Sequence, residues 1–108
     1  MTMQDREYEE QVDCLFNDIE DKIDEIEQDV DVDSTAGMLT IGFPDGSSVI
    51  LSRQIANHEV WVAAKSGGYH LAFTDGQWFC RTSKENLSSL LDRVFAEQLG
   101  EPAPGFTL

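Results

Sequence analysis

The chain has 108 residues and a formal net charge of −14, from 21 acidic and 7 basic residues. This length predicts one domain, with residues 1–108 sharing a single core. The hydrophobic share of 41% argues against a disordered chain, and no apolar run reaches the ~20 residues that span a bilayer. Because the charge repels phosphate, we exclude nucleic acid and membranes as partners and expect cations or basic protein surfaces.

No basic and apolar leader precedes the first patterned segment, so we expect no secretory signal and a cytoplasmic protein. The two cysteines, Cys14 and Cys80, lie far apart and outside any CxxC pair. Isolated thiols of this kind fit a reducing compartment better than a disulfide framework, with one bridge between them left open as the alternative.

The first third of the chain combines a helical apolar pattern with most of the negative charge. Residues 1–33 contain fourteen acidic and two basic residues. Apolar residues recur there at spacings of three and four, which predicts an amphipathic helix of about six turns. This stripe consists of Tyr8, Val12, Leu15, Phe16, Ile19, Ile23, Ile26 and Val30.

Acidic residues crowd the second half of this helix at spacings that make their side chains neighbours. Glu20 and Asp24, and likewise Asp21 and Glu25, are four residues apart. Each like-charged pair costs about 0.2–0.5 kcal/mol of helix stability, and the carboxyl end of the helix dipole is already negative. Because such violations are most frequent at functional sites, we predict a site for cations or a basic partner. A solvated face that only confers solubility is the alternative.

Alternating aspartate and valine follow from Asp29 to Asp33. An EF-hand loop starting at Asp29 would need Gly at its sixth position and Glu at its twelfth, which are Ser34 and Thr40 here. The alternation instead predicts a short edge strand with Asp31 and Asp33 on one face, beside the helix and extending one acidic ridge.

From residue 38 the pattern changes to the two-residue alternation of β-strands. We expect strands at 39–43, 48–54, 59–64, 69–74 and 77–81. A second helix with an apolar stripe over 87–99 follows, begun by a capping box of Thr82 with Glu85 and ended by Gly100. The connections are too short for crossover helices. The order therefore predicts an α+β two-layer sandwich, with two helices packed on one face of an antiparallel sheet of about five or six strands.

The alternation also predicts which side chains face away from the helices. If Val60 and Val62 lie in the core, Trp61 points to the open face of the sheet, where it is a candidate contact for a protein partner. Capping of Trp61 by neighbouring side chains is the alternative. Trp78 is expected in the core.

No catalytic constellation is visible in the sequence. His58 and His70 have no cysteine or acid at ligand spacing, so we interpret them as ordinary surface or core histidines. A Ser-His-Asp set, a phosphate-binding glycine loop and HExxH are all missing from the sequence, so we expect no enzyme activity.

Six short segments are specific in combination. They are Ile19–Glu25, Gly37–Ile41, Arg53–Gln54, His58–Ala63, Lys65–His70 and Asp75–Trp78. Together they resemble the frataxin family, of the bacterial CyaY type, over nearly the whole chain. The resemblance implies a frataxin-like fold and a regulator or adaptor of iron–sulfur cluster assembly. Such a protein binds iron (Fe2+ or Fe3+) weakly, with other cations able to substitute, and docks onto the cysteine desulfurase and the scaffold protein.

The resemblance also implies site residues by position. The implied metal ligands are Glu20, Asp21, Asp24, Glu25, Asp31 and Asp33, and the implied partner-binding residues are Arg53, Gln54 and Trp61. We expect a monomer, with oligomerisation on iron as the alternative. A carboxylate-based iron oxidase or an iron-storage protein is the competing hypothesis, although the chain has no Glu-x-x-His motif of di-iron sites. An anionic mimic that blocks nucleic-acid-binding proteins is a third.

Overall fold

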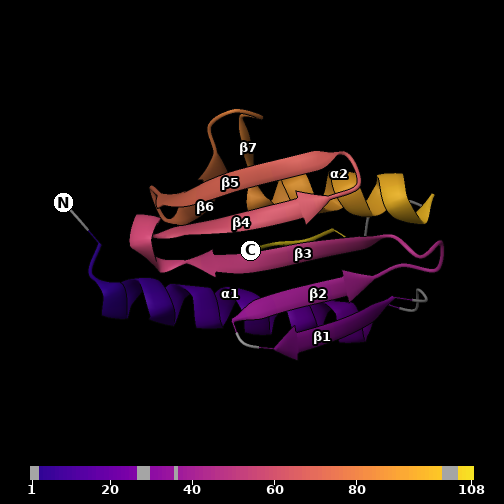
Figure 1. Cartoon of the computed structure of the whole chain (residues 1–108), viewed down its shortest axis with the longest axis horizontal. Helices are drawn as coiled ribbons and strands as arrows, with labels where there is room; N and C mark the ends of the chain where they lie inside the picture. The colour runs from indigo at the N-terminus through magenta and orange to yellow at the C-terminus, as the bar shows by residue number, and fades with distance from the viewer. Residues whose placement is uncertain (1–2, 27–29, 36, 101–104) are drawn as a thin grey trace.

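The computed structural model describes residues 3–26, 30–35, 37–100 and 105–108. Within these ranges, two helices lie behind one face of an antiparallel sheet, and the other face is open (Figure 1). The helices are α1 (Asp5–Glu25) and α2 (Leu87–Leu99). The strands are β1 (Asp31–Thr35), β2 (Met38–Gly42), β3 (Ser48–Gln54), β4 (Glu59–Ala64), β5 (Gly67–Thr74), β6 (Gln77–Cys80) and β7 (Glu85–Asn86), with a 3-10 turn η1 (Ile55–Asn57) between β3 and β4.

The predicted two-layer α+β sandwich is confirmed, with the strands in sequence order across the sheet. The described residues form seven strands rather than five or six, because the two-residue β7 pairs with the end of β6. Alternate residues of β2, β3 and β4 are buried against the helices. This alternation puts Trp61 on the open face, as predicted, and Trp78 is only 5% exposed in the core.

Helix α1 buries most of its predicted stripe. The buried residues are Tyr8, Val12, Leu15, Phe16, Ile19 and Ile23. The prediction that the helix extends to Val30 is wrong, because α1 ends at Glu25 and Ile26 already has extended backbone angles, φ −83° and ψ 146°. Repulsion among carboxylates at the negative end of the helix dipole disfavours further helical turns. The acidic residues Glu27 and Asp29 lie outside the described residues.

The predicted capping box at the start of α2 is also wrong. The cap is Asn86, whose side-chain oxygen accepts a hydrogen bond of 2.9 Å from the backbone N–H of Ser89. Thr82 instead lies in the turn between β6 and β7, and Glu85 belongs to β7. The far end of α2 is as predicted, because Gly100 adopts the left-handed conformation with φ 71° that closes the helix.

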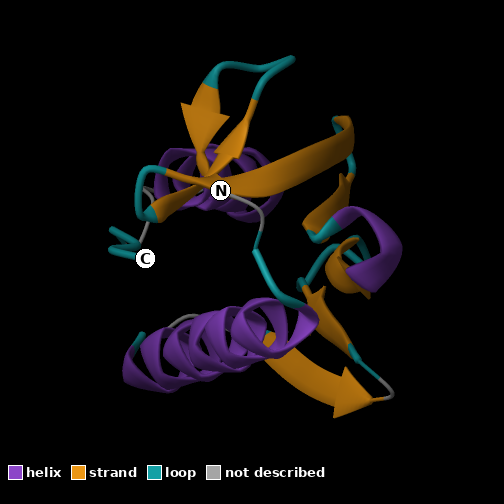
Figure 2. Cartoon of the chain, turned by 90° about the vertical axis from the view of Figure 1, so that its left-hand side faces the viewer, coloured by secondary structure: helices purple, strands orange, loops and turns teal. Residues whose placement is uncertain are grey.

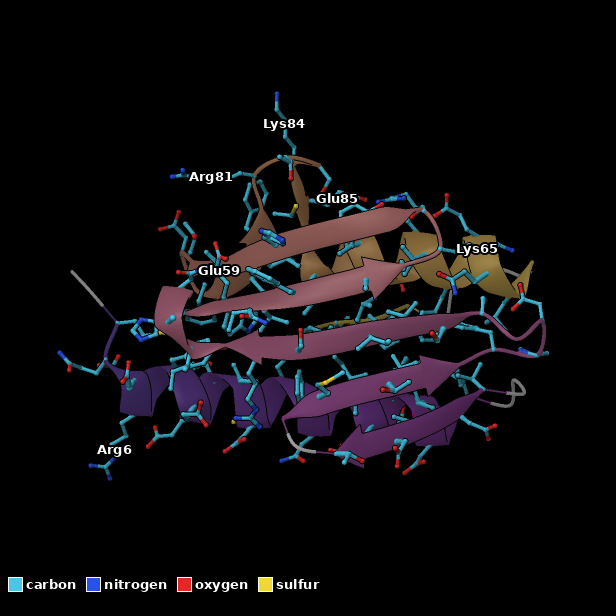
Figure 3. The ribbon with its side chains drawn as sticks, viewed as in Figure 1. Arg6, Glu59, Lys65, Arg81, Lys84 and Glu85 are labelled. Atoms are coloured by element: carbon cyan, nitrogen blue, oxygen red, sulfur yellow. The ribbon has the colours of Figure 1, made fainter. Side chains whose placement is uncertain are left out.

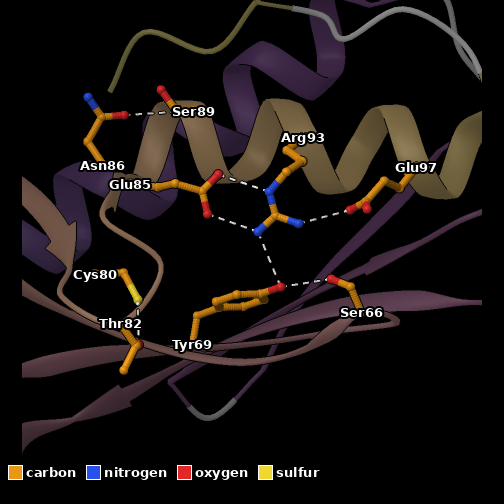
Figure 4. Close-up of polar contacts among 9 residues, drawn as sticks. All are labelled: Ser66, Tyr69, Cys80, Thr82, Glu85, Asn86, Ser89, Arg93 and Glu97. Atoms are coloured by element: carbon orange, nitrogen blue, oxygen red, sulfur yellow. Dashed lines mark hydrogen bonds and ion pairs between the residues drawn. The ribbon is translucent and has the colours of Figure 1, made fainter.

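A polar cluster joins α2 to β5 and β7 at the side of the sheet (Figure 4). The guanidinium of Arg93 donates two hydrogen bonds of 2.9 Å to the carboxylate of Glu85 and one of 3.2 Å to the hydroxyl of Tyr69. The hydrogen bonds from Arg93 outweigh burial and hold the pKa of Glu85 below its usual range. The bidentate geometry fixes how β7 meets α2.

The C-terminal segment packs back onto the helical layer, between α1 and α2 (Figure 2). Phe106 is 4% exposed, and its ring meets the ring of Phe95 edge-on with centroids 4.9 Å apart. Asp92 accepts a hydrogen bond of 2.9 Å from the backbone N–H of Phe106. The segment therefore completes the core below the sheet.

The two cysteines are free, with Cys14 exposed on α1 and Cys80 buried on β6, so the alternative of one bridge is wrong. Among the described residues, no helix is long and apolar enough to cross a membrane.

Candidate functional site

Acidic residues in the first half of α1 have basic partners. Arg53 on β3 reaches across to α1, where its guanidinium donates to Asp13 and, at 2.9 Å, to Glu9, and lies over the ring of Phe16. Its side chain is only 22% exposed. One partly buried guanidinium thus binds both carboxylates and offsets one of their two negative charges.

Acidic residues near the start of α1 also have basic neighbours. The Nε2 atom of His58 lies 2.6 Å from the Asp5 carboxylate, and the imidazole stacks on the ring of Tyr8. Arg6 lies 3.5 Å from Glu10 in an exposed pair of adjacent turns. His58 is thus an ordinary structural histidine, as predicted.

The second half of α1 differs. Among the described residues, no ion pair reaches its acidic side chains. These are Asp18, Glu20, Asp21, Asp24 and Glu25. All are exposed except Glu20, which is half-buried. Among the described residues, the acidic side chains of α1 without an ion pair are therefore Glu7 and the five in residues 18–25.

Helical geometry places these carboxylates on one continuous outer face of α1. Successive residues turn by about 100°, so Glu20, Asp24, Asp21 and Glu25 follow one another around the helix in steps of about 40–60°. Asp21 and Glu25 line a hollow of about 270 Å³ against the C-terminal Thr107 and Leu108. Asp18 and the ammonium-bearing Lys22 line the same hollow. The hollow thus gathers three carboxylates and one cation.

Asp31 and Asp33 lie on one face of β1, as predicted, but on the side away from α1. They pair with Gly42 and Thr40, while Val32 between them packs against the core. Since the core side of the sheet carries the helices, strand alternation turns both aspartates to the open face. Val32 takes the core-facing position of β1, and the extension of the helical ridge by Asp31 and Asp33 stays a prediction.

Of the six metal ligands implied by the family resemblance, four therefore share one face of α1 and two lie on β1, and their role in one metal site stays a prediction. Within the part of the chain that the structure describes, no group of three or more acidic, histidine or cysteine side chains is arranged to hold a metal ion.

The three partner-binding candidates also divide between two faces. Gln54 and Trp61 lie on the open face, where Gln54 pairs with Glu59 and Trp61 pairs with His70. Arg53 follows the core parity of β3 and is engaged with α1. The structure thus brings Gln54 and Trp61 onto a shared surface and turns Arg53 to the helix side.

Trp61 is held rigidly on the open face by two neighbours. Its indole N–H donates a hydrogen bond of 2.8 Å to the carboxylate of Glu59. Its ring stacks on the imidazole of His70, with centroids 4.1 Å apart and planes 6° from parallel. The alternative that neighbouring side chains cap Trp61 is therefore correct for one of its faces. An indole ordered in advance loses little entropy on binding a partner.

Asp18, Glu59 and His70 are site residues that sequence reasoning missed. The signal for Glu59 and His70 was present in strand parity, which places every second residue of β4 and β5 beside Trp61. No signal in the sequence indicated that Asp18 meets the C-terminal segment, because that contact joins distant parts of the chain.

Comparison with known proteins gives a consistent result. The frataxin-like domain model matches residues 1–101. The iron–sulfur cluster assembly protein CyaY of Stutzerimonas stutzeri (strain A1501) is 43% identical over 103 residues, which cover 94% of each chain. The protein of the same name from Azotobacter vinelandii is 39% identical over 103 residues, again 94% of each chain.

Solved structures show the same likeness. Frataxin from Psychromonas ingrahamii matches with a TM-score of 0.89 at 30% identity, over 97% of this chain and 100% of that one. A trimeric frataxin from the yeast Saccharomyces cerevisiae shares the fold at a TM-score of 0.69 and 17% identity, over 94% of this chain and 90% of that one. The sequence match spans nearly the whole chain and agrees with the fold, and the chain therefore belongs to the frataxin family.

Proposed function

We propose that this chain is a cytoplasmic regulator or adaptor of iron–sulfur cluster assembly, which binds iron weakly and docks onto the cysteine desulfurase–scaffold complex. Family membership and the names of its relatives support the assembly role. The observation that supports iron binding and docking is the distribution of ion pairs on α1. Basic side chains contact four carboxylates of its first half, whereas among the described residues no ion pair reaches the five carboxylates of residues 18–25.

Ferrous and ferric ions are cations that accept carboxylate oxygens and water as ligands. The hollow against the C-terminal segment offers the carboxylates of Asp18, Asp21 and Glu25. These side chains are exposed, so a cation bound there would keep several waters and bind with a dissociation constant of about tens of micromolar or weaker. Such affinity fits a sensor or a transient carrier better than a storage site.

The same carboxylates complement a basic protein surface, which we assign to the cysteine desulfurase. Gln54 and Trp61 on the open face supply a second contact, toward the scaffold. Arg53 lies behind this contact as a positioning residue, because its guanidinium is already engaged by Glu9 and Asp13. Iron and the desulfurase would then compete for residues 18–25, which makes docking dependent on iron.

An anaerobic titration with Fe2+, followed by amide NMR, tests the iron site. Broadening is expected around residues 18–25 in the wild type and is expected to be lost when Asp21→Asn is combined with Glu25→Gln. The control combines Glu7→Gln with Glu10→Gln, which changes the charge equally in the first half of α1. Equal loss of broadening in both double variants would mean that only net charge matters, and the site would be rejected.

Docking is tested separately by biolayer interferometry with the purified desulfurase–scaffold complex. The Asp21→Asn and Glu25→Gln variant is expected to bind about tenfold more weakly than the wild type, which corresponds to about 1.4 kcal/mol. Binding that is unchanged in this variant would remove residues 18–25 from the docking surface.

A further inference from the structure

A hollow on the open face of the sheet is lined by charged and polar groups that no step of the proposed function uses. It has a volume of about 360 Å³ and lies beside the stacked rings of Trp61 and His70. Its apolar lining comes from Ala72 and Phe79, and its polar lining from Glu59, His70, Arg81 and Thr82. The hollow is therefore a polar socket next to an aromatic platform.

The positive charge at this socket is uncompensated. Arg6, Arg53, Lys65 and Arg93 all form ion pairs with carboxylates. Lys22 forms no ion pair among the described residues, but it lines the hollow that holds Asp18, Asp21 and Glu25. Among the described residues, no ion pair reaches Arg81 or Lys84, which are both exposed on the turn between β6 and β7 and extend from it into solvent (Figure 3).

Arg81 differs from Lys22 in its surroundings. Lys22 lines a hollow with three carboxylates, whereas the hollow that Arg81 lines has Glu59 as its one carboxylate among the described residues. The guanidinium of Arg81 at the wall of the socket is therefore available to a carboxylate from another molecule unless Glu59 takes it.

The one carboxylate in the socket does not serve as that partner. Glu59 accepts the indole N–H of Trp61 at 2.8 Å, which holds its carboxylate at the β4 side of the hollow. Arg81 follows β6, and in the strand order β5 separates β6 from β4. The guanidinium of Arg81, the imidazole of His70 and the hydroxyl of Thr82 therefore remain to meet an incoming group.

We propose that this socket binds the carboxylate of an aspartate or glutamate side chain on the protein partner that docks on the open face. A guanidinium takes a carboxylate through two parallel hydrogen bonds, which gives both strength and direction. A polyanion such as nucleic acid does not fit, because a chain of net charge −14 repels it. A single acidic side chain within an otherwise basic surface meets no such barrier.

The proposal rests on the proposed function, and it adds an orientation to the docking. The acidic residues 18–25 and the Asp31 edge lie at the α1–β1 side of the molecule, whereas Arg81 and Lys84 lie at the β6–β7 side (Figures 1 and 3). A partner seated on the open face must then present basic groups toward β1 and an acidic group toward the turn after β6. The reversed orientation would oppose like charges at both ends.

The first test measures binding to the desulfurase–scaffold complex by biolayer interferometry. Arg81→Glu is expected to weaken binding at least tenfold. Lys65→Glu is the matched control, because it makes the same charge change at an exposed lysine of the turn after β4, and it is expected to change binding less than twofold. Equal effects of the two substitutions would overturn the socket while leaving the proposed function standing.

The second test does not depend on that partner. A blocked tripeptide with one glutamate between two lysines is titrated to about 10 mM, in the range of a weak single-site contact, and amide shifts are followed by NMR. Shifts are expected at residues 79–84 in the wild type, and they are expected to be absent with Arg81→Gln and with the tripeptide that carries glutamine in place of glutamate. No shift in the wild type would overturn the socket. If shifts occur although the wild type does not bind the desulfurase–scaffold complex, the socket stands and the partner is wrong.

Discussion

The hydroxyl of Tyr8 on α1 donates a hydrogen bond of 2.6 Å to the backbone carbonyl of Glu59 at the start of β4. The same oxygen accepts the backbone N–H of Gln54 at 2.9 Å. The helix that carries the acidic cluster is thus tied to both strand ends that flank η1. Those ends carry Gln54 and Glu59, and Glu59 holds the indole of Trp61. One phenol therefore links the two surfaces assigned to partners.

Replacing Tyr8→Phe removes this link while keeping the ring. The change leaves a half-buried carbonyl and a half-buried N–H without their partner, and we expect a loss of about 1 kcal/mol in the free energy of unfolding. Urea unfolding followed by tryptophan fluorescence measures this loss. A loss below about 0.5 kcal/mol would show that water replaces the hydroxyl and that the strand ends do not depend on it.

Arg53→Gln tests whether this arginine serves the fold. The substitution removes two ion pairs and the contact with the Phe16 ring, so we expect a loss of about 1–3 kcal/mol in the free energy of unfolding. Arg6→Gln is the control, because Arg6 is 91% exposed in its pair with Glu10, and exposed pairs of this kind contribute about 0.3–0.5 kcal/mol. Similar values for the two variants would contradict the bridging role of Arg53.

Gln98→Ala tests a buried side-chain amide that joins α2 to the turn before β3 and to the turn after β4. Gln98 is 6% exposed, accepts the backbone N–H of Lys65 at 3.1 Å and donates to Ser47 Oγ at 2.9 Å. Removing it leaves polar groups without partners, so we expect about 1–3 kcal/mol of destabilisation. Gln77→Ala at an exposed position of β6 should cost less than about 0.5 kcal/mol. Thermal unfolding of both variants measures the two losses of stability. Equal midpoints for the two variants would contradict a stabilising role of the Gln98 hydrogen bonds.

The Glu85–Arg93 pair predicts a pH dependence of stability. Hydrogen bonds from Arg93 lower the pKa of Glu85 in the folded state. The pair therefore stabilises the folded protein fully at pH values above the ordinary glutamate pKa. This stabilisation is lost as the pH falls through the lowered pKa of the folded state. Glu85→Gln should therefore cost about 1–2 kcal/mol at neutral pH. It should cost progressively less as the medium is acidified below the ordinary glutamate pKa.

Glu97→Gln is the control for this prediction, because Glu97 binds the same guanidinium from a side chain that is 49% exposed. Its effect should stay below about 0.5 kcal/mol at every pH. Urea unfolding at several pH values gives both series, and a cost of Glu85→Gln that is independent of pH would contradict the assignment.

The sequence alone determined which residues share a face. The stripe from Tyr8 to Ile23 and the core parity of Val60 and Val62 were predicted correctly, because backbone geometry repeats every 3.6 residues in a helix and every two in a strand. Open-face placement of Trp61 follows from the same rule. The concentration of acidic residues in the first third of the chain can likewise be read directly from the sequence.

Tertiary structure decided what each face meets. Arg53 and Gln54 are adjacent in sequence, yet Arg53 turns to α1 and Gln54 to the open face. Thr82 fitted a local capping pattern, but pairing of β7 with β6 moved the start of α2 to Asn86. Asp31 and Asp33 were predicted on one edge strand, and the packing of Val32 against the core decided which face of the sheet they take. Such outcomes depend on contacts between segments distant along the chain, which local periodicity does not encode.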